Sequence, residues 1–157
     1  MKVFERLVLG HLKRQVKDSI DPLQFAYQAN KGVDDAILFM LHRTYSHLEN
    51  TGSSVRIMFF DFSSAFNTIH PSLLGEKLRT MQVDNSLVNW ILHWLTCRPQ
   101  YVRLQDCKSG VVESSVGAPQ GTVLAPYLFT LYTSDFRYNS GSCNLQKISS
   151  PVTQIVF

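Results

Sequence analysis

The chain has 157 residues, a length typical of one domain that can bury a hydrophobic core. Hydrophobic residues make up 45% of the sequence and charged residues 17%, which excludes an intrinsically disordered chain. The net charge of +3 is modest. The three cysteines form no Cys-x-x-Cys pair and the histidines have no metal-ligand spacing, so we expect reduced thiols and an intracellular protein, nuclear or cytoplasmic and not secreted.

No apolar run approaches the length of a membrane span, so we expect no membrane partner. At the N-terminus Glu5 and Arg6 interrupt the apolar residues, which argues against a signal peptide. Residues 2–19 are instead predicted to form an amphipathic helix. Its apolar face is expected to consist of Phe4, Leu7, Val8, Leu12 and Val16.

Basic residues are concentrated in this first helix. Five of the fifteen lysines and arginines lie in the first seventeen positions: Lys2, Arg6, Lys13, Arg14 and Lys17. Such a cluster favours a surface that faces a polyanion, and these five residues are the candidate nucleic-acid contacts. Taken alone, the segment is better explained as an ordinary solvated helix face, because blocks of charge usually are solvated.

The next elements follow from turn and helix signals. Asp21-Pro22 is expected to end the first helix, because the residue before proline is disfavoured in the α conformation. An irregular segment at residues 23–32 follows. A second helix is predicted at residues 33–48, and Asp34 and Asp35 suit the positive end of its dipole.

Apart from Arg56, the residues before Asp61 are apolar, which predicts a central strand buried on both faces: Val55, Ile57, Met58, Phe59 and Phe60. Asp61 comes directly after this run. An acid at the end of a central strand is one way to present a carboxylate to a ligand. The alternative is that Asp61 caps the next helix, as Ser63 and Ser64 could also do.

The second half of the chain alternates helices with hairpins. Pro126 fits the helix predicted there if it lies in the first turn. The predicted elements are helices at 72–81, capped by Ser72, and at 85–95, strands at 101–105 and 111–116, a loop at 117–122, a helix at 123–132, and a hairpin at 145–157. This order predicts an α+β fold with a mostly antiparallel sheet.

Two motifs taken together resemble one known family. The first is Phe60-Asp61-Phe-Ser-Ser-Ala-Phe66, and the second, some fifty residues later, is Gly117-Ala-Pro-Gln-Gly121-Thr. The ordered pair strongly resembles the reverse transcriptase domain of non-LTR (LINE-type) retrotransposons, over about residues 2–147. The resemblance implies a partial right-hand polymerase, with a fingers-like segment at 1–50, an incomplete palm at 51–157, and no thumb.

The resemblance also implies roles for single residues. Asp61 matches a catalytic, metal-binding aspartate, with Phe62 beside it in the nucleotide site. Phe66 matches the bulky residue that stacks under the incoming sugar and excludes a 2′-hydroxyl. Two further pairs match nucleotide-binding or template-binding positions: Gln120 and Gly121 in the loop, and Gln28 and Lys31, where many relatives carry arginines.

The expected partners are an RNA template, a DNA primer and deoxynucleoside triphosphates, with Mg²⁺ as cofactor. The chain departs from the family at the third palm motif, where two adjacent aspartates are expected and Ser150 and Pro151 stand instead. Because two-metal nucleotidyl transfer needs several carboxylates, we expect weak or absent Mg²⁺ binding and no turnover. The alternatives are a non-catalytic RNA- or DNA-binding remnant, or a relic of a transposed element without a function.

Overall fold

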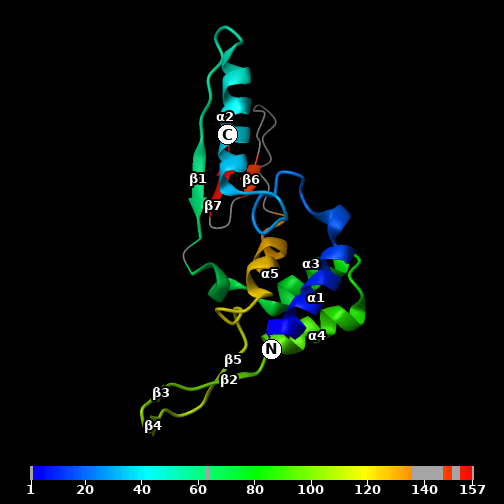
Figure 1. Cartoon of the computed structure of the whole chain (residues 1–157), viewed down its shortest axis with the longest axis vertical. Coiled ribbons are helices and arrows are strands. Elements are labelled where there is room, and N and C mark those ends of the chain that lie inside the picture. The colour runs from blue at the N-terminus through cyan, green and yellow to red at the C-terminus, as the bar shows by residue number, and fades with distance from the viewer. Residues whose placement is uncertain (1, 63, 136–146, 150–152, 157) are drawn as a thin grey trace. The chain divides into compact units, whose positions relative to one another are not determined.

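The computed structural model of the chain describes residues 2–62, 64–135, 147–149 and 153–156 (Figure 1). The chain divides into two compact units, each built from two separate segments. Unit 1 comprises Met1–Ser19 and Ser64–Tyr132, and unit 2 comprises Ile20–Ser63 and Thr133–Phe157. All the described strand pairs are antiparallel and occur beside several α-helices, so the predicted mixture of helices with an antiparallel sheet is confirmed.

Unit 1 is mainly helical. Its helices are α1 (Lys2–Gln15), α3 (Pro71–Thr80), α4 (Asn85–Leu95) and α5 (Ala125–Tyr132), with short 3₁₀ helices η1 (Lys17–Ser19) and η2 (Ala65–Thr68). Helix α3 packs against both α4 and α5. Fully buried side chains from every one of these α-helices form the core: Leu12, Leu74, Leu78, Ile91, Leu95, Leu128 and Leu131.

Local signals set the helix starts in unit 1. Asp84 caps α4, because its carboxylate accepts hydrogen bonds from the backbone N–H groups of Ser86 and Leu87 at 2.9 and 3.2 Å. Pro71 is the first residue of α3, where its missing N–H removes no helical hydrogen bond. The expectation that Ser72 caps α3 is therefore wrong by two residues, since His70 is the N-cap.

The apolar face expected for α1 is only partly correct. Val8, Leu12 and Val16 are buried, whereas Phe4 and Leu7 are 53% and 69% exposed. The helix is turned so that Glu5, at 3% exposure, continues the buried stripe in place of the two apolar residues. Its carboxylate has hydrogen-bond partners in the core of unit 1, which are described below.

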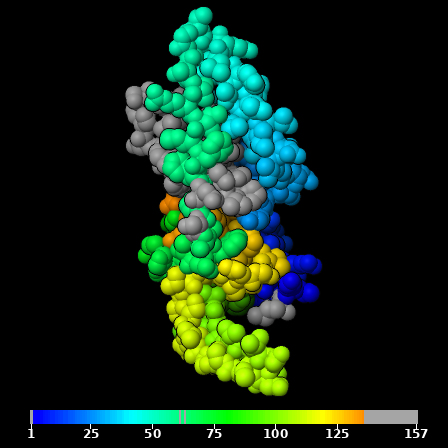
Figure 2. All heavy atoms as spheres, turned by 90° about the vertical axis from the view of Figure 1, so that its left-hand side faces the viewer, coloured from blue at the N-terminus to red at the C-terminus, as the bar shows by residue number. Residues whose placement is uncertain are grey.

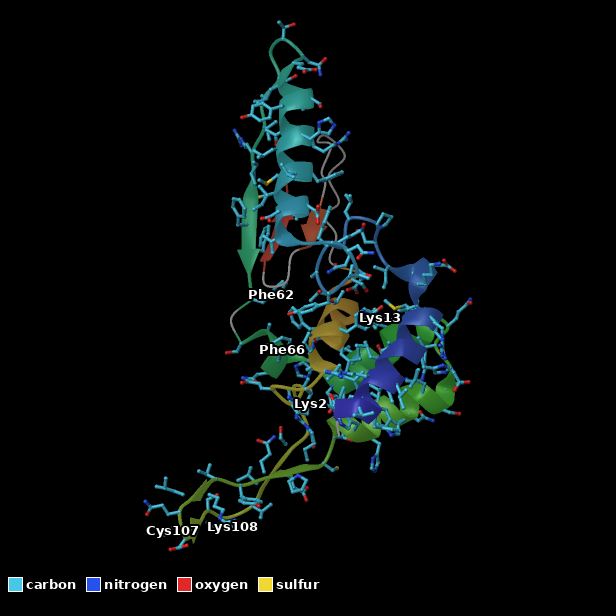
Figure 3. All side chains as sticks on the ribbon, viewed as in Figure 1. Lys2, Lys13, Phe62, Phe66, Cys107 and Lys108 are labelled. Atoms are coloured by element: carbon cyan, nitrogen blue, oxygen red, sulfur yellow. The ribbon has the colours of Figure 1, made fainter. Side chains whose placement is uncertain are left out.

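A long hairpin extends from the helices of unit 1, with Cys107 and Lys108 near its tip (Figures 1 and 3). Its yellow-green atoms form the lower end of the view in Figure 2. Strand β2 (Arg98–Gln100) pairs with β5 (Val112–Ser114), and β3 (Arg103–Leu104) pairs with β4 (Cys107–Lys108). The hairpin was predicted, but its first strand begins at Arg98, before the expected start at Tyr101.

Unit 2 contains helix α2 (Val33–Leu48) and a three-stranded sheet of β1 (Met58–Asp61), β6 (Lys147–Ser149) and β7 (Thr153–Val156). The strand order is β1-β7-β6, so the predicted C-terminal hairpin forms and pairs with β1. The prediction that β1 is a central strand buried on both faces is wrong. Met58 and Phe59 are 46% and 63% exposed, and successive side chains of a strand point to opposite faces, so both faces of β1 are partly uncovered. Among the described strands β1 is also at the edge of its sheet, with β7 as its neighbour.

Few of the side chains whose burial the structure describes in unit 2 are buried. A small cluster forms around Ala36 of α2, against which Phe25, Phe39 and Met40 pack. The start of α2 is fixed by Asp35, whose carboxylate accepts a hydrogen bond from the Gly32 N–H at 2.6 Å. Across the ranges that the structure describes, no helix has the length and apolar character needed to cross a membrane.

Candidate functional site

Two segments that lie far apart in the sequence are hydrogen-bonded to each other in unit 1. The backbone N–H of Gly117 donates to the carbonyl oxygen of Ile69, and that of Ala118 donates to the carbonyl oxygen of Phe66, both at 2.7 Å. The structure thus brings Phe66 and the 117–122 loop together, although some fifty residues separate them.

Gly117 makes this approach possible. Its φ angle is +75°, in the left-handed region where side chains are strained. A Cβ atom at this position would lie 2.9 Å from both the Asn67 Cα and the Phe66 carbonyl oxygen. A larger residue would therefore separate the loop from η2.

The ring of Phe66 is held by helix α5. It is half-buried and makes an edge-to-face contact with Phe129, with the ring centroids 5.9 Å apart. Phe129 is itself 7% exposed, so it provides a fixed support. The side chain expected to contact the incoming sugar is thus positioned by the unit 1 core.

Gln120 and Gly121 form the exposed tip of the loop. Gly121 has a φ angle of +74°, but a Cβ there would meet nothing within 4 Å. Thr122 ends the loop: its hydroxyl donates to the Pro119 carbonyl at 2.8 Å and accepts from the Ala125 N–H at 3.3 Å. The hydroxyl joins the loop tip to the first turn of α5 and leaves Gln120 at the surface.

Two side chains that the sequence did not single out hold the ends of this loop. The Glu5 carboxylate accepts hydrogen bonds from the backbone N–H groups of Val123 at 2.7 Å and Leu124 at 3.4 Å. The Arg98 guanidinium donates to the carbonyl oxygens of Val116 and Gly117 at 2.7 and 3.0 Å. Partial burial lowers the pKa of Arg98 from its usual value.

One sequence signal could have identified Glu5. Residues 5, 8, 12 and 16 are spaced so that they lie on one face of a helix, and three of them are apolar. An acid that continues an apolar stripe is expected to be buried, and a buried carboxylate needs a hydrogen-bond or charge partner. Arg98 gave no comparable signal, because it precedes Pro99 and the pair indicates only that the preceding helix has ended.

The basic residues of α1 separate into two groups. Lys2, Arg6 and Lys13 share one flank, because spacings of four and eleven residues return to the same side of an α-helix. This flank borders α5, since the Lys13 ammonium lies 5.0 Å from the centre of the Tyr127 ring. Figure 3 shows Lys2 near the start of α1 and Lys13 near its end.

The other two basic residues of this segment lie elsewhere. Arg14 is hydrogen-bonded to the ring nitrogen of His11 at 3.2 Å, and Lys17 is an exposed residue of η1. We call Lys2, Arg6 and Lys13 the α1 basic row.

The remaining candidate nucleotide contacts belong to unit 2. Lys31 donates a hydrogen bond to the Pro22 carbonyl at 2.6 Å and lies 5.1 Å from the centre of the Phe25 ring. Gln28 is half-buried, and its side-chain amide nitrogen has no hydrogen-bond partner among the residues that the structure describes. Phe62 is half-buried just after β1. The roles of these residues stay predictions.

Asp61 is the last residue of β1. It is not the N-cap of η2, because Ser64 occupies that position and makes no side-chain capping bond. The strand register pairs Asp61 with Thr153 of β7, and β6 ends at Ser149. The strand ends on this side of the sheet are therefore Thr153 of β7 and Ser149 of β6. Ser150 and Pro151, which come between these strands in the sequence, lie outside the described residues.

The residue types at these strand ends do not fit a centre for two magnesium ions. Asp61 supplies one carboxylate, whereas Ser149 and Thr153 are neutral. Magnesium in proteins favours carboxylates together with substrate phosphates, and a two-ion centre needs more than one such acid. Within the described ranges, no group of three or more His, Cys, Asp or Glu residues could hold a metal ion.

Comparison of the chain with known protein families supports the family that the two motifs indicated. Residues 1–142 match the family described as reverse transcriptase (RNA-dependent DNA polymerase). The chain therefore belongs to the reverse transcriptase family.

Two curated relatives place the chain within this family. It is 29% identical over 137 residues to the RNA-directed DNA polymerase from mobile element jockey of Drosophila melanogaster. It is also 29% identical over 140 residues to the protein of the same name from Drosophila funebris. Jockey is a LINE-type non-LTR element, so the predicted resemblance is confirmed. Each match covers 85% of this chain but only 15% of the relative's length.

Proposed function

We propose that this chain retains a reverse transcriptase surface for template, primer and incoming nucleotide but does not catalyse nucleotide addition. The observation that carries the proposal is the hydrogen-bonded contact of Gly117 and Ala118 with Ile69 and Phe66. This contact joins the residue expected under the incoming sugar to the loop expected to touch the nucleotide and template.

In this proposal the chain is part of a right-hand polymerase, with a fingers-like segment at 1–50 and a palm-like segment at 51–157. Phe66 stacks under the sugar, a role that suits a ring already supported by Phe129. Gln120 and Gly121 contact the nucleotide and the template backbone, which agrees with their exposure at the loop tip. Gln28, Lys31 and Phe62 provide further nucleotide contacts.

The proposed lack of turnover rests on the set of acids. The family's two-metal chemistry uses Asp61 together with a pair of adjacent aspartates, and Ser150 and Pro151 stand in place of that pair. One carboxylate can help to hold a nucleotide-bound magnesium ion weakly, because the phosphates supply the other ligands. An ion that activates the primer hydroxyl has no comparable set of ligands here.

A relic of a mobile element without any function is the second candidate. Large apolar side chains on the surface of unit 2 favour it, since exposed apolar patches reduce solubility. Leu38, Tyr45 and Phe59 are 64%, 66% and 63% exposed. Aggregation of the purified chain, together with a lack of salt-dependent binding to nucleic acid, would support this candidate.

Binding of a fluorescent RNA–DNA hybrid at several salt concentrations tests the proposal. We expect the affinity to fall as salt rises, because phosphate contacts release counterions. Replacing the α1 basic row, Lys2, Arg6 and Lys13, with alanine should reduce the slope of log affinity against log salt by about 0.7–0.9 for each lost phosphate contact. The matched control replaces Arg14 and Lys17. Binding that does not change with salt would refute the proposal.

A further inference from the structure

Glu5 is a buried acid in helix α1 with partners far along the sequence. Its side chain is 3% exposed, and one carboxylate oxygen accepts hydrogen bonds from the N–H groups of Val123 and Leu124 at 2.7 and 3.4 Å. A carboxylate is rarely buried unless it is paired in this way. The hydrogen bonds therefore account for the acid at this position.

The two N–H groups lie immediately before helix α5, which begins at Ala125. N–H groups at the start of a helix have no partner within the helix, and the helix dipole favours a negative charge there. Hydrogen bonds to an ionised carboxylate are about twice as strong as those between neutral groups. Glu5 is thus well suited to fix this part of the backbone.

The loop tip lies between two fixed points. On one side the Gly117 and Ala118 N–H groups are bonded to the Ile69 and Phe66 carbonyls. On the other side Glu5 holds residues 123 and 124. Only residues 119–122 lie between these points, and they include Gln120 and Gly121.

We infer that Glu5 is a positioning residue: its carboxylate fixes the backbone after the loop and so sets where Gln120 and Gly121 stand. The inference rests on the proposed function of that loop. It extends the functional region from the 117–122 loop to a side chain that comes more than a hundred residues earlier in the sequence.

Hydrogen exchange of single backbone amides tests the contact itself. In the full chain we expect Glu5→Ala to speed exchange at Val123 and Leu124 by about tenfold or more, the effect of losing a charge-assisted hydrogen bond. Glu5→Gln should cause a smaller increase, because its amide oxygen still accepts a hydrogen bond. Asp18→Asn is the control, since Asp18 is an exposed acid in the same N-terminal segment. Unchanged exchange in Glu5→Ala would overturn the inference.

Nucleotide binding separates positioning from general stabilisation. The affinity of a deoxynucleoside triphosphate for the chain with a bound RNA–DNA hybrid should fall about tenfold in Glu5→Ala and less in Glu5→Gln. Ile91→Val, which removes one methylene from the fully buried core of the same unit, should leave this affinity within about twofold. Equal losses in Glu5→Ala and Ile91→Val would overturn the inference. If the wild-type chain binds neither hybrid nor nucleotide, the proposed function fails, whereas hydrogen exchange still decides whether Glu5 holds the loop.

Discussion

Unit 1 and unit 2 both carry candidate functional residues, but they differ in how many buried apolar side chains the structure describes in each. All the buried apolar side chains that the structure describes belong to unit 1, apart from Ala26 and Ala36. Unit 1 also holds ten of the fifteen basic residues but only six of the twelve acidic ones. Unit 2 has five basic and six acidic residues, so the positive excess of the chain belongs to unit 1.

The candidate binding residues of the loop and of α1 belong to a different unit from the candidate catalytic residue. The loop with Gln120 and Gly121 and the α1 basic row lie on a unit with a well-formed core, and backbone hydrogen bonds fix the loop. Asp61 instead ends a strand whose side chains are partly exposed, and no second acid lies at the neighbouring described strand ends. The proposal that the chain binds nucleic acid but does not catalyse nucleotide addition rests on this difference.

The largest difference should appear when one leucine is truncated in each unit. Leu78 of α3 is fully buried, whereas Leu38 of α2 is 64% exposed. We expect Leu78→Ala to lower the free energy of unfolding by about 2–5 kcal/mol, and Leu38→Ala to change it by less than about 0.5 kcal/mol. Urea unfolding followed by circular dichroism measures both. Equal effects would show that the two units do not differ in packing.

Adding a single Cβ atom at Gly117 should disrupt the contact between the 117–122 loop and η2. Gly117→Ala places a Cβ atom 2.9 Å from backbone atoms of Phe66 and Asn67, in addition to the strain of a positive φ angle. We expect a loss of about 2–3 kcal/mol, compared with about 1 kcal/mol for Gly121→Ala, which has the same strain but no neighbour. Tryptophan fluorescence reports unit 1 selectively, because Trp90 and Trp94 both lie in α4. Equal losses would mean that close approach is unimportant.

A smaller effect is expected at alkaline pH. Burial raises the pKa of Tyr127 to about 12 from the ordinary value of 10.0. Between these two values the folded chain keeps a proton that the unfolded chain releases, so stability falls as the pH rises above 10. We expect the wild type to lose about 1 kcal/mol more than Tyr127→Phe between pH 9 and 11. Parallel stability curves for the two proteins would contradict the burial of this hydroxyl.

Local chemistry made part of the fold predictable from the sequence. Asp84 caps α4, and Pro126 lies in the first turn of α5, because both effects depend on residues within one helical turn. The hairpins were also predictable from turn residues between apolar runs. The pairing of β1 with β7 followed from neither signal, because it joins residues almost a hundred positions apart.

The candidate site shows the same limit. The resemblance selected Phe66 and Gln120, and the structure added how they are held: by Phe129, Glu5 and Arg98. The helical spacing could mark Glu5 as a buried acid, but its partners could not be assigned from the sequence, because they are backbone N–H groups, which every residue except proline carries. The exposure of Phe59 was missed because an apolar run does not show whether both sides of a strand are covered.

Primer extension tests the central claim most directly. The purified chain is incubated with an RNA template, a labelled DNA primer, all four deoxynucleoside triphosphates and either Mg²⁺ or Mn²⁺, and hybrid binding is measured in the same buffer. We predict that the hybrid is bound in a salt-dependent way and that the primer is not extended. Extension by the wild-type chain that disappears in Asp61→Ala would contradict the claim that binding has been kept without catalysis.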